Sequence, residues 1–138
     1  MKYRKLSGYK YQIMEDMVVQ TDITPSIDLR FEFIELSSAG KLLIKKGYAW
    51  DGVTSFPRTP KILLRGSLVH DALYQLMRLG GLDYKKDRIF ADKILQRIII
   101  EDGVSEEKAK CIYEAVRLVG EIYAKQTTEP EVVIYEFP

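Results

Sequence analysis

The sequence has one cysteine, Cys111, and one histidine, His70. A single thiol cannot form an intramolecular disulfide, and it excludes a zinc site built from several cysteines. Cys111 lies in a helical pattern, where we expect it to be a small buried side chain.

Neither sign of charge dominates the chain. The formal net charge is +1, so no overall field would recruit nucleic acid or an anionic membrane. The most apolar stretch, residues 98–100, is too short to span a bilayer, and MKYRKLSGYKYQ at the N-terminus has no apolar run that could serve as a signal peptide. We therefore expect a cytoplasmic protein with no membrane partner and no strong nucleic-acid signal.

The length and composition are those of one globular domain. The chain has 138 residues, of which 46% are hydrophobic and 30% charged. It contains no repeat, no low-complexity tract and no linker rich in proline, glycine or serine. We expect a single domain over residues 1–138, mainly β over 1–55 and mainly α over 61–125.

The N-terminal part of the chain has the alternation of a β-sheet. Between residues 9 and 50, apolar residues alternate with polar ones or form short β-branched and aromatic runs. These runs predict strands at 12–21, 28–36 and 41–49. Ser-Ser-Ala-Gly at 37–40 predicts a hairpin loop between the last two, because Gly40 can adopt a positive φ.

Beyond residue 60 the periodicity is helical. Residues 51–60 contain a glycine and two prolines and predict an irregular segment. Helices are expected at 61–78, 84–101 and 105–125, with Ser105 as the N-cap of the third. The tail at 131–137 reads as a strand that returns to the N-terminal sheet. This order predicts an α+β fold: an N-terminal antiparallel sheet, three packed helices and a closing C-terminal strand.

The helix expected at 61–78 carries the first candidate site residues. It is apolar around most of its circumference, so it should run through the core. His70, Asp71, Ser67 and Tyr74 share the remaining arc. A charged aspartate in a central helix is costly unless it is paired, hydrogen-bonded or bound to a metal. Asp71 therefore predicts a compensating partner.

Two further carboxylates are candidate neighbours. Asp87 points along the apolar stripe of the second helix, whereas Asp92 lies about 140° away around the helix, so we expect Asp92 to be solvated. Asp51 follows directly after a predicted strand, in a loop of the kind that often carries functional groups. The candidate polar site is therefore Asp51, His70, Asp71 and Asp87.

Four ordered segments resemble elements of domain-of-unknown-function family 1353. Residues 47–54 (GYAWDGVT) resemble its Gly-aromatic-x-x-Asp-Gly element, and residues 68–74 (LVHDALY) resemble its His-Asp-x-Leu-Tyr helix. Residues 86–90 (KDRIF) are similar to its Ala-Asp-x-x-Phe element, with Lys86 in place of the usual alanine. Residues 112–120 (IYEAVRLVG) resemble its closing helix.

The resemblance implies a phage or prophage origin and brings no established activity with it. It maps the recurring polar residues of the family onto Asp51, Thr54, His70, Asp71 and Asp87. These overlap the positions selected by helix geometry.

One interpretation of the site is metal-assisted hydrolysis. One imidazole and several carboxylates suit Mn²⁺, Mg²⁺, Ca²⁺ or Zn²⁺. The ligands would be Asp51, His70 and Asp87, with Asp71 orienting a ligand or acting as a base beside His70. Thr54 and Tyr74 would support the site. Adjacent His70 and Asp71 point about 100° apart on a helix, which makes it difficult for both to bind one ion.

The alternative is a buried polar network without catalysis. In it Asp51 or Asp87 accepts a hydrogen bond from His70, while Asp71 caps the loop at Asp51 or pairs with Arg65 or Arg117. A third interpretation is a metal-free acid–base site, in which a carboxylate activates His70. A network without catalysis would fit an assembly or host-interaction protein, in the host cell or the virion, with a phage or host protein as partner. The edge strands of the sheet also allow a homodimer.

Overall fold

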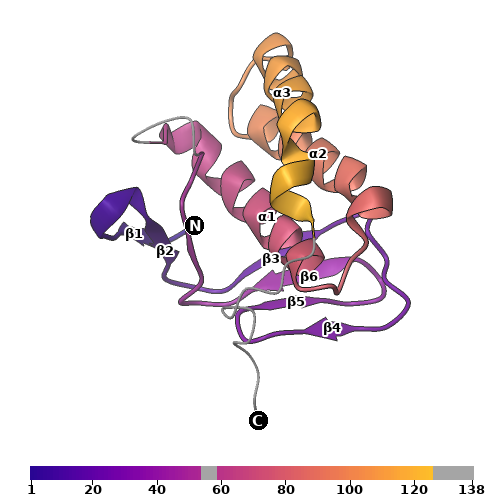
Figure 1. Cartoon of the computed structure of the whole chain (residues 1–138). Coiled ribbons are helices and arrows are strands. Elements are labelled where there is room, and N and C mark those ends of the chain that lie inside the picture. Colours follow the sequence, from indigo (N-terminus) through magenta and orange to yellow (C-terminus); the bar gives the residue numbers. More distant parts are fainter. Residues whose placement is uncertain (54–58, 126–138) are drawn as a thin grey trace.

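The computed structural model describes residues 1–53 and 59–125, and the described chain is α+β (Figure 1). Antiparallel strands come first and three helices follow, as the sequence predicts. The predicted strand at 131–137 and the candidate residue Thr54 lie outside the described residues. The elements, in chain order, are β1 Tyr3–Lys5, the 3-10 helix η1 Ser7–Tyr9, β2 Tyr11–Ile13, β3 Met17–Gln20, β4 Leu29–Arg30, β5 Ile34–Leu36, β6 Lys41–Ile44, β7 Ala49–Trp50, α1 Lys61–Arg78, α2 Tyr84–Glu101 and α3 Glu106–Ala124.

The strands form two sheets, ordered β1-β2-β7 and β3-β6-β5-β4. The predicted strands at 12–21 and 41–49 are each divided between the two sheets, so their continuity was predicted wrongly. Both segments bend where they lie next to each other. There the Ile13 N–H donates to Tyr48 O at 2.9 Å, and the Gly47 N–H donates to Ile13 O at 2.9 Å. Gly47 has a φ of 101°, which favours glycine and interrupts the strand.

The predicted strand at 28–36 folds back on itself. The Phe31 N–H donates to Ile34 O at 2.9 Å, and β4 pairs with β5 so that Leu29 lies opposite Leu36. The hairpin predicted at 37–40 is confirmed, with Gly40 at a φ of 89° between β5 and β6.

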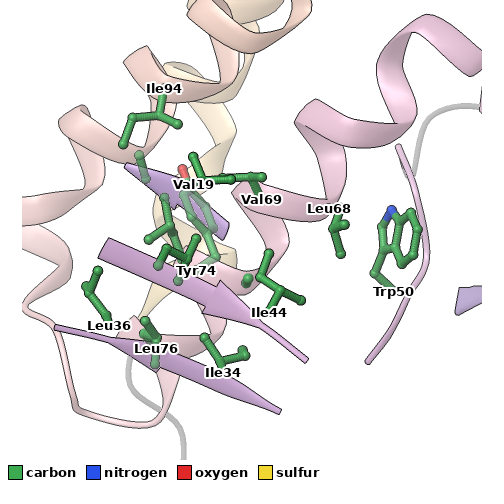
Figure 2. Close-up of a cluster of buried hydrophobic side chains, with 14 of the residues drawn as sticks. Val19, Ile34, Leu36, Ile44, Trp50, Leu68, Val69, Tyr74, Leu76 and Ile94 are labelled. Carbon is green, nitrogen blue, oxygen red and sulfur yellow. The ribbon is translucent and has the colours of Figure 1, made fainter. Parts of the chain in front are cut away.

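The three helices lie on one side of the four-stranded sheet (Figure 1). Leu76 of α1 lies beside the buried side chains of Ile34 and Leu36 on the sheet, and Leu68 of α1 lies beside Trp50 (Figure 2). Full burial of each such side chain contributes roughly 1.5–3 kcal/mol. The core therefore packs α1 against both the sheet and α2, which fixes the side chains that α1 presents.

Close packing between α1 and α2 depends on a glycine. A Cβ at Gly66 would lie 2.6 Å from Cγ2 of Ile99. At the same contact, Arg65 donates to Glu101 at 2.8 Å and to Asp102 at 3.1 Å, so the predicted pairing of Arg65 with Asp71 is wrong. Ser105 is the N-cap of α3, as predicted, and accepts from the Lys108 N–H at 3.2 Å. Within the described ranges, no helix is long and apolar enough to cross a membrane.

Candidate functional site

A carboxylate with no solvent exposure, that of Asp92, lies where the three helices meet. Its Oδ1 accepts a hydrogen bond of 2.6 Å from the Tyr74 hydroxyl and lies 2.7 Å from Nε2 of His70. Its Oδ2 accepts from Arg117 Nη1 at 2.9 Å and from Arg88 Nη1 at 3.4 Å. We call these five residues the Asp92 cluster. It joins α1, α2 and α3 through one side chain.

The prediction that Asp92 is solvated is therefore wrong. The angular argument assigned one buried face to α2, the face along the stripe of Ile94 and Ile98. In the structure α2 packs against α1 and also against α3, so a second face is buried, and Asp92 lies on it.

The prediction that Asp87 points inward as a ligand finds no counterpart in the described contacts. Its carboxylate is partly buried at the start of α2 and accepts from the Asp83 N–H at 3.1 Å. The Asp83 side chain in turn accepts from the Lys85 N–H at 3.0 Å. Reciprocal bonds of this kind cap a helix N-terminus. Asp87 therefore has a local structural role in this conformation.

Electrostatics keep Asp92 ionised. Burial alone would raise the pKa of Asp92, but hydrogen bonds from His70 and Tyr74, the charge of His70 and a hydrogen bond from Arg117 outweigh it and hold that pKa below its usual value. Burial and the bond to Asp92 raise the pKa of Tyr74, so its phenol remains a neutral donor. An ionised Asp92 requires His70 Nε2 to carry a proton, so a metal could bind His70 only at Nδ1 and only while the imidazole is neutral.

The cluster also depends on how closely α3 approaches. Gly120 is buried, and a Cβ at this position would clash with the Tyr74 hydroxyl and lie 2.9 Å from Arg88 Nη1. Arg88 donates further to Val116 O at 3.2 Å, which ties α2 to the backbone of α3. The predicted pairing of Arg117 with Asp71 is wrong, because Arg117 bonds to Asp92.

Asp71 belongs to a different group, on the side of α1 that faces β7. Burial, with a further contribution from the charge of the Asp51 carboxylate, raises the pKa of Asp71 to about 7. Arg78 and a hydrogen bond from the backbone of Asp51 act in the opposite direction. The predicted capping of the Asp51 loop by Asp71 is in line with this hydrogen bond.

The surroundings of Asp71 include a buried phenol. Tyr48 donates to Gln75 Oε1 at 2.9 Å, and burial, followed by the charge of Asp71, raises its pKa. Asp51 itself is exposed, with its carboxylate 3.9 Å from Lys10 Nζ. We call Tyr48, Asp51, Asp71, Gln75 and Arg78 the Asp71 group.

The predicted ligands Asp51, His70 and Asp87 therefore fall in three places: the Asp71 group, the Asp92 cluster and the cap of α2. In residues 1–53 and 59–125, no three histidine, cysteine, aspartate or glutamate side chains are grouped so that they could hold a metal ion. The predicted supporting residue Tyr74 binds Asp92. Asp92, Arg88 and Arg117 were not predicted from the sequence as members of one polar cluster. The spacing of Arg88 and Asp92, four residues apart on one helix, was the one local signal for them.

Comparison with known proteins identifies a family but no function. No curated protein and no solved structure matches the chain. A family model described as "Protein of unknown function (DUF1353)" matches residues 26–116, which run from before β4 into α3 and include Asp51, His70, Asp71 and Asp92. Because this match covers more than half of the sequence, the chain belongs to the DUF1353 family, as its motifs led us to expect.

Proposed function

We propose that this protein is a non-catalytic interaction protein, in which the Asp92 cluster holds three helices together and the surface of α3 binds a partner. The observation that supports this most is the complete burial of Asp92 with four hydrogen-bonding partners. A catalytic carboxylate has to reach a substrate in an open concave site. Asp92 is instead closed off from solvent, and both of its carboxylate oxygens already have hydrogen-bonding partners, which is typical of a structural network.

The exposed side of α3 supports the binding part of the proposal. Leu118 is 85% exposed and Ile122 is 76% exposed, and Val119 and Tyr123 are exposed beside them. Contiguous apolar side chains of this size on a helix surface are typical of an interaction site. The family resemblance favours a phage or host protein as the partner, in assembly or in contact with a host factor.

Metal-assisted hydrolysis is the competing proposal. It would require His70 to turn Nδ1 towards a metal while Nε2 holds Asp92, and Asp51 and Asp87 to leave their present surroundings. The feature in its favour is Asp71, since a carboxyl with a pKa of about 7 suits a general acid or base. Asp71 and His70, however, belong to separate groups.

Thermal unfolding separates the two proposals. The wild type and His70→Ala are melted in EDTA and then with added Mn²⁺, Mg²⁺, Ca²⁺ or Zn²⁺. We expect the same Tm for the wild type with and without each ion, and a lower Tm for His70→Ala throughout, since the variant leaves Asp92 short of a donor. A rise in Tm with one ion in the wild type, absent in His70→Ala, would follow from ligand binding and would overturn the proposal in favour of a metal enzyme.

A further inference from the structure

The exposed side of α3 carries a regular apolar stripe. Cys111, Ala115, Leu118 and Ile122 are all exposed, and they follow one another at intervals of four, three and four residues. This spacing is the a/d repeat of a two-stranded coiled coil, in which such side chains insert between those of a partner helix. We call these four residues the α3 stripe.

A row of acids lies beside the α3 stripe. Glu107, Glu114 and Glu121 are exposed and follow one another every seven residues, so they form a line along one edge of the stripe. The Glu121 carboxylate lies 3.9 Å from Nζ of Lys125. Residues at such flanking positions of a coiled coil select the charge of the partner.

We propose that the α3 stripe binds an amphipathic helix of another protein whose apolar stripe is flanked by lysine or arginine residues. This inference rests on the proposed function and adds the chemistry of the partner to it. The basic residues of the partner helix would face the glutamate row. The apolar side chains of the partner helix would cover Leu118 and Ile122 and shield them from water. The charges set the specificity, and the apolar contacts supply most of the affinity.

The negative charge of the glutamate row disfavours two other possible occupants of the α3 stripe. In a second copy packed antiparallel, the glutamate row of one α3 would meet the glutamate row of the other. Residues 126–138 contain three glutamates and no lysine or arginine, so this segment would bring like charge to the same edge. A basic helix meets neither obstacle.

The size of the stripe sets the expected strength. From Cys111 to Ile122 it extends over roughly 17 Å of helix. An interface of this length falls below the standard size for stable complexes, so we expect a transient complex with a Kd in the micromolar range or weaker.

Two designed helical peptides test the proposal. Both have three heptads with leucine at the a and d positions, and they differ in having lysine or glutamate at the e and g positions. Binding to the full chain is measured by fluorescence anisotropy for the wild type, for Leu118→Asp and for a control, Ile27→Asp. Ile27 is also an exposed apolar residue, at 67% exposure, but lies outside α3.

We expect the lysine peptide to bind the wild type at least ten-fold more tightly than the glutamate peptide, and the difference to shrink as salt is added. Leu118→Asp should abolish binding, and Ile27→Asp should leave it unchanged. The triple variant Glu107→Lys, Glu114→Lys and Glu121→Lys should reverse the preference. Equal binding of both peptides, or binding that Leu118→Asp does not weaken, would overturn the proposal.

The same variants identify the other occupants. A concentration-dependent dimer in light scattering that Leu118→Asp dissociates would assign the stripe to a second copy and overturn the proposal. Peptide binding that occurs only in the full-length variant Val133→Asp/Ile134→Asp would assign the stripe to the chain's own tail and also overturn it. Failure of the lysine peptide would refute the partner chemistry alone, whereas a metal-dependent Tm would refute the non-catalytic function whatever the peptides do.

Discussion

The Tyr74 hydroxyl donates a 2.6 Å hydrogen bond to Oδ1 of the fully buried Asp92, and the Tyr74 ring lies 4.2 Å, centroid to centroid, from the ring of His70. Tyr74 and His70 are one turn apart on α1, so one face of this helix offers two donors to one carboxylate oxygen. Arg88 and Arg117 occupy the other oxygen. The residues that resemble a catalytic His-Asp pair in the sequence therefore lie in two different environments: His70 is part of a helix junction, and Asp71 is on another side of the helix.

Removing the carboxylate of Asp92 should be strongly destabilising. In Asp92→Ala, two guanidinium groups, an imidazole and a phenol lose their common acceptor inside the helix junction. Breaking a buried ion pair in this way costs about 3–5 kcal/mol. We expect a loss of this order in the free energy of unfolding, measured by urea denaturation.

A second aspartate variant provides the control for Asp92. Asp22→Ala changes an exposed residue and should shift the free energy of unfolding by less than about 0.5 kcal/mol. If Asp92→Ala proved as mild as Asp22→Ala, the cluster would not hold the helices together.

Gly120→Ala should destabilise the protein, although a glycine-to-alanine change inside a helix ordinarily stabilises by roughly 0.5–1 kcal/mol. The added methyl would clash with the Tyr74 hydroxyl, which is held against Asp92 and cannot move away freely. Equilibrium unfolding should therefore show the opposite sign to that expected from helix propensity.

A double variant tests the cause of the Gly120 effect. Tyr74→Phe removes the oxygen that the new methyl would meet, so Gly120→Ala should cost less in the Tyr74→Phe background than in the wild type. Equal costs in both backgrounds would mean that the clash lies elsewhere.

Cys111 should react with a thiol reagent in the native protein, because its side chain is exposed on the α3 stripe. The helical pattern around Cys111 predicted a buried thiol, and that prediction is wrong. Labelling should proceed without denaturant, and the lysine peptide at saturating concentration should slow it, because the peptide would cover the stripe. Labelling that requires denaturant would contradict the exposure of this face.

The fold was predictable where periodicity is long and boundaries are marked chemically. The predicted bounds of α1 and α2 coincide with the observed ones, and Ser105 caps α3 as predicted. The strands were less predictable, because the bend at Gly47 and the turn after Phe31 depend on two sheets whose pairing is set by distant residues.

The candidate site was only partly predictable for a similar reason. That Asp71 needs compensation follows from its place on an apolar helix. That Asp92 is buried follows only from the approach of α3, since the spacing of Arg88 and Asp92 in α2 predicts an ion pair but not a second packed face. Gly120 and Arg117 make that approach possible, and they lie far from Asp92 in the sequence.

The raised pKa of Asp71 predicts how stability changes with pH. In the folded protein the pKa is about 7, whereas an unfolded aspartate titrates near ~3.9. Between these values the unfolded chain loses its proton first, so the folded state is progressively destabilised as pH rises from about 4 to about 7. Below this window the Asp71 carboxyl is neutral in both states, and above it the full penalty applies.

Asp71→Asn isolates this penalty, because asparagine has nearly the same shape and cannot ionise. The variant should match the wild type near pH 4 and exceed it by on the order of 2 kcal/mol at pH 8, after allowance for solvent screening of a partly exposed side chain. Urea unfolding of the wild type and Asp71→Asn across this range measures the difference, because the contributions of groups common to both proteins cancel. Asp51→Asn should lower the pKa of Asp71 in the folded protein, since the charge of Asp51 contributes to raising it. The pH range over which stability changes should then end at a lower pH. A constant difference across the range would mean that Asp71 is ionised throughout, and the argument for an acid–base role of Asp71 would then lose its physical basis.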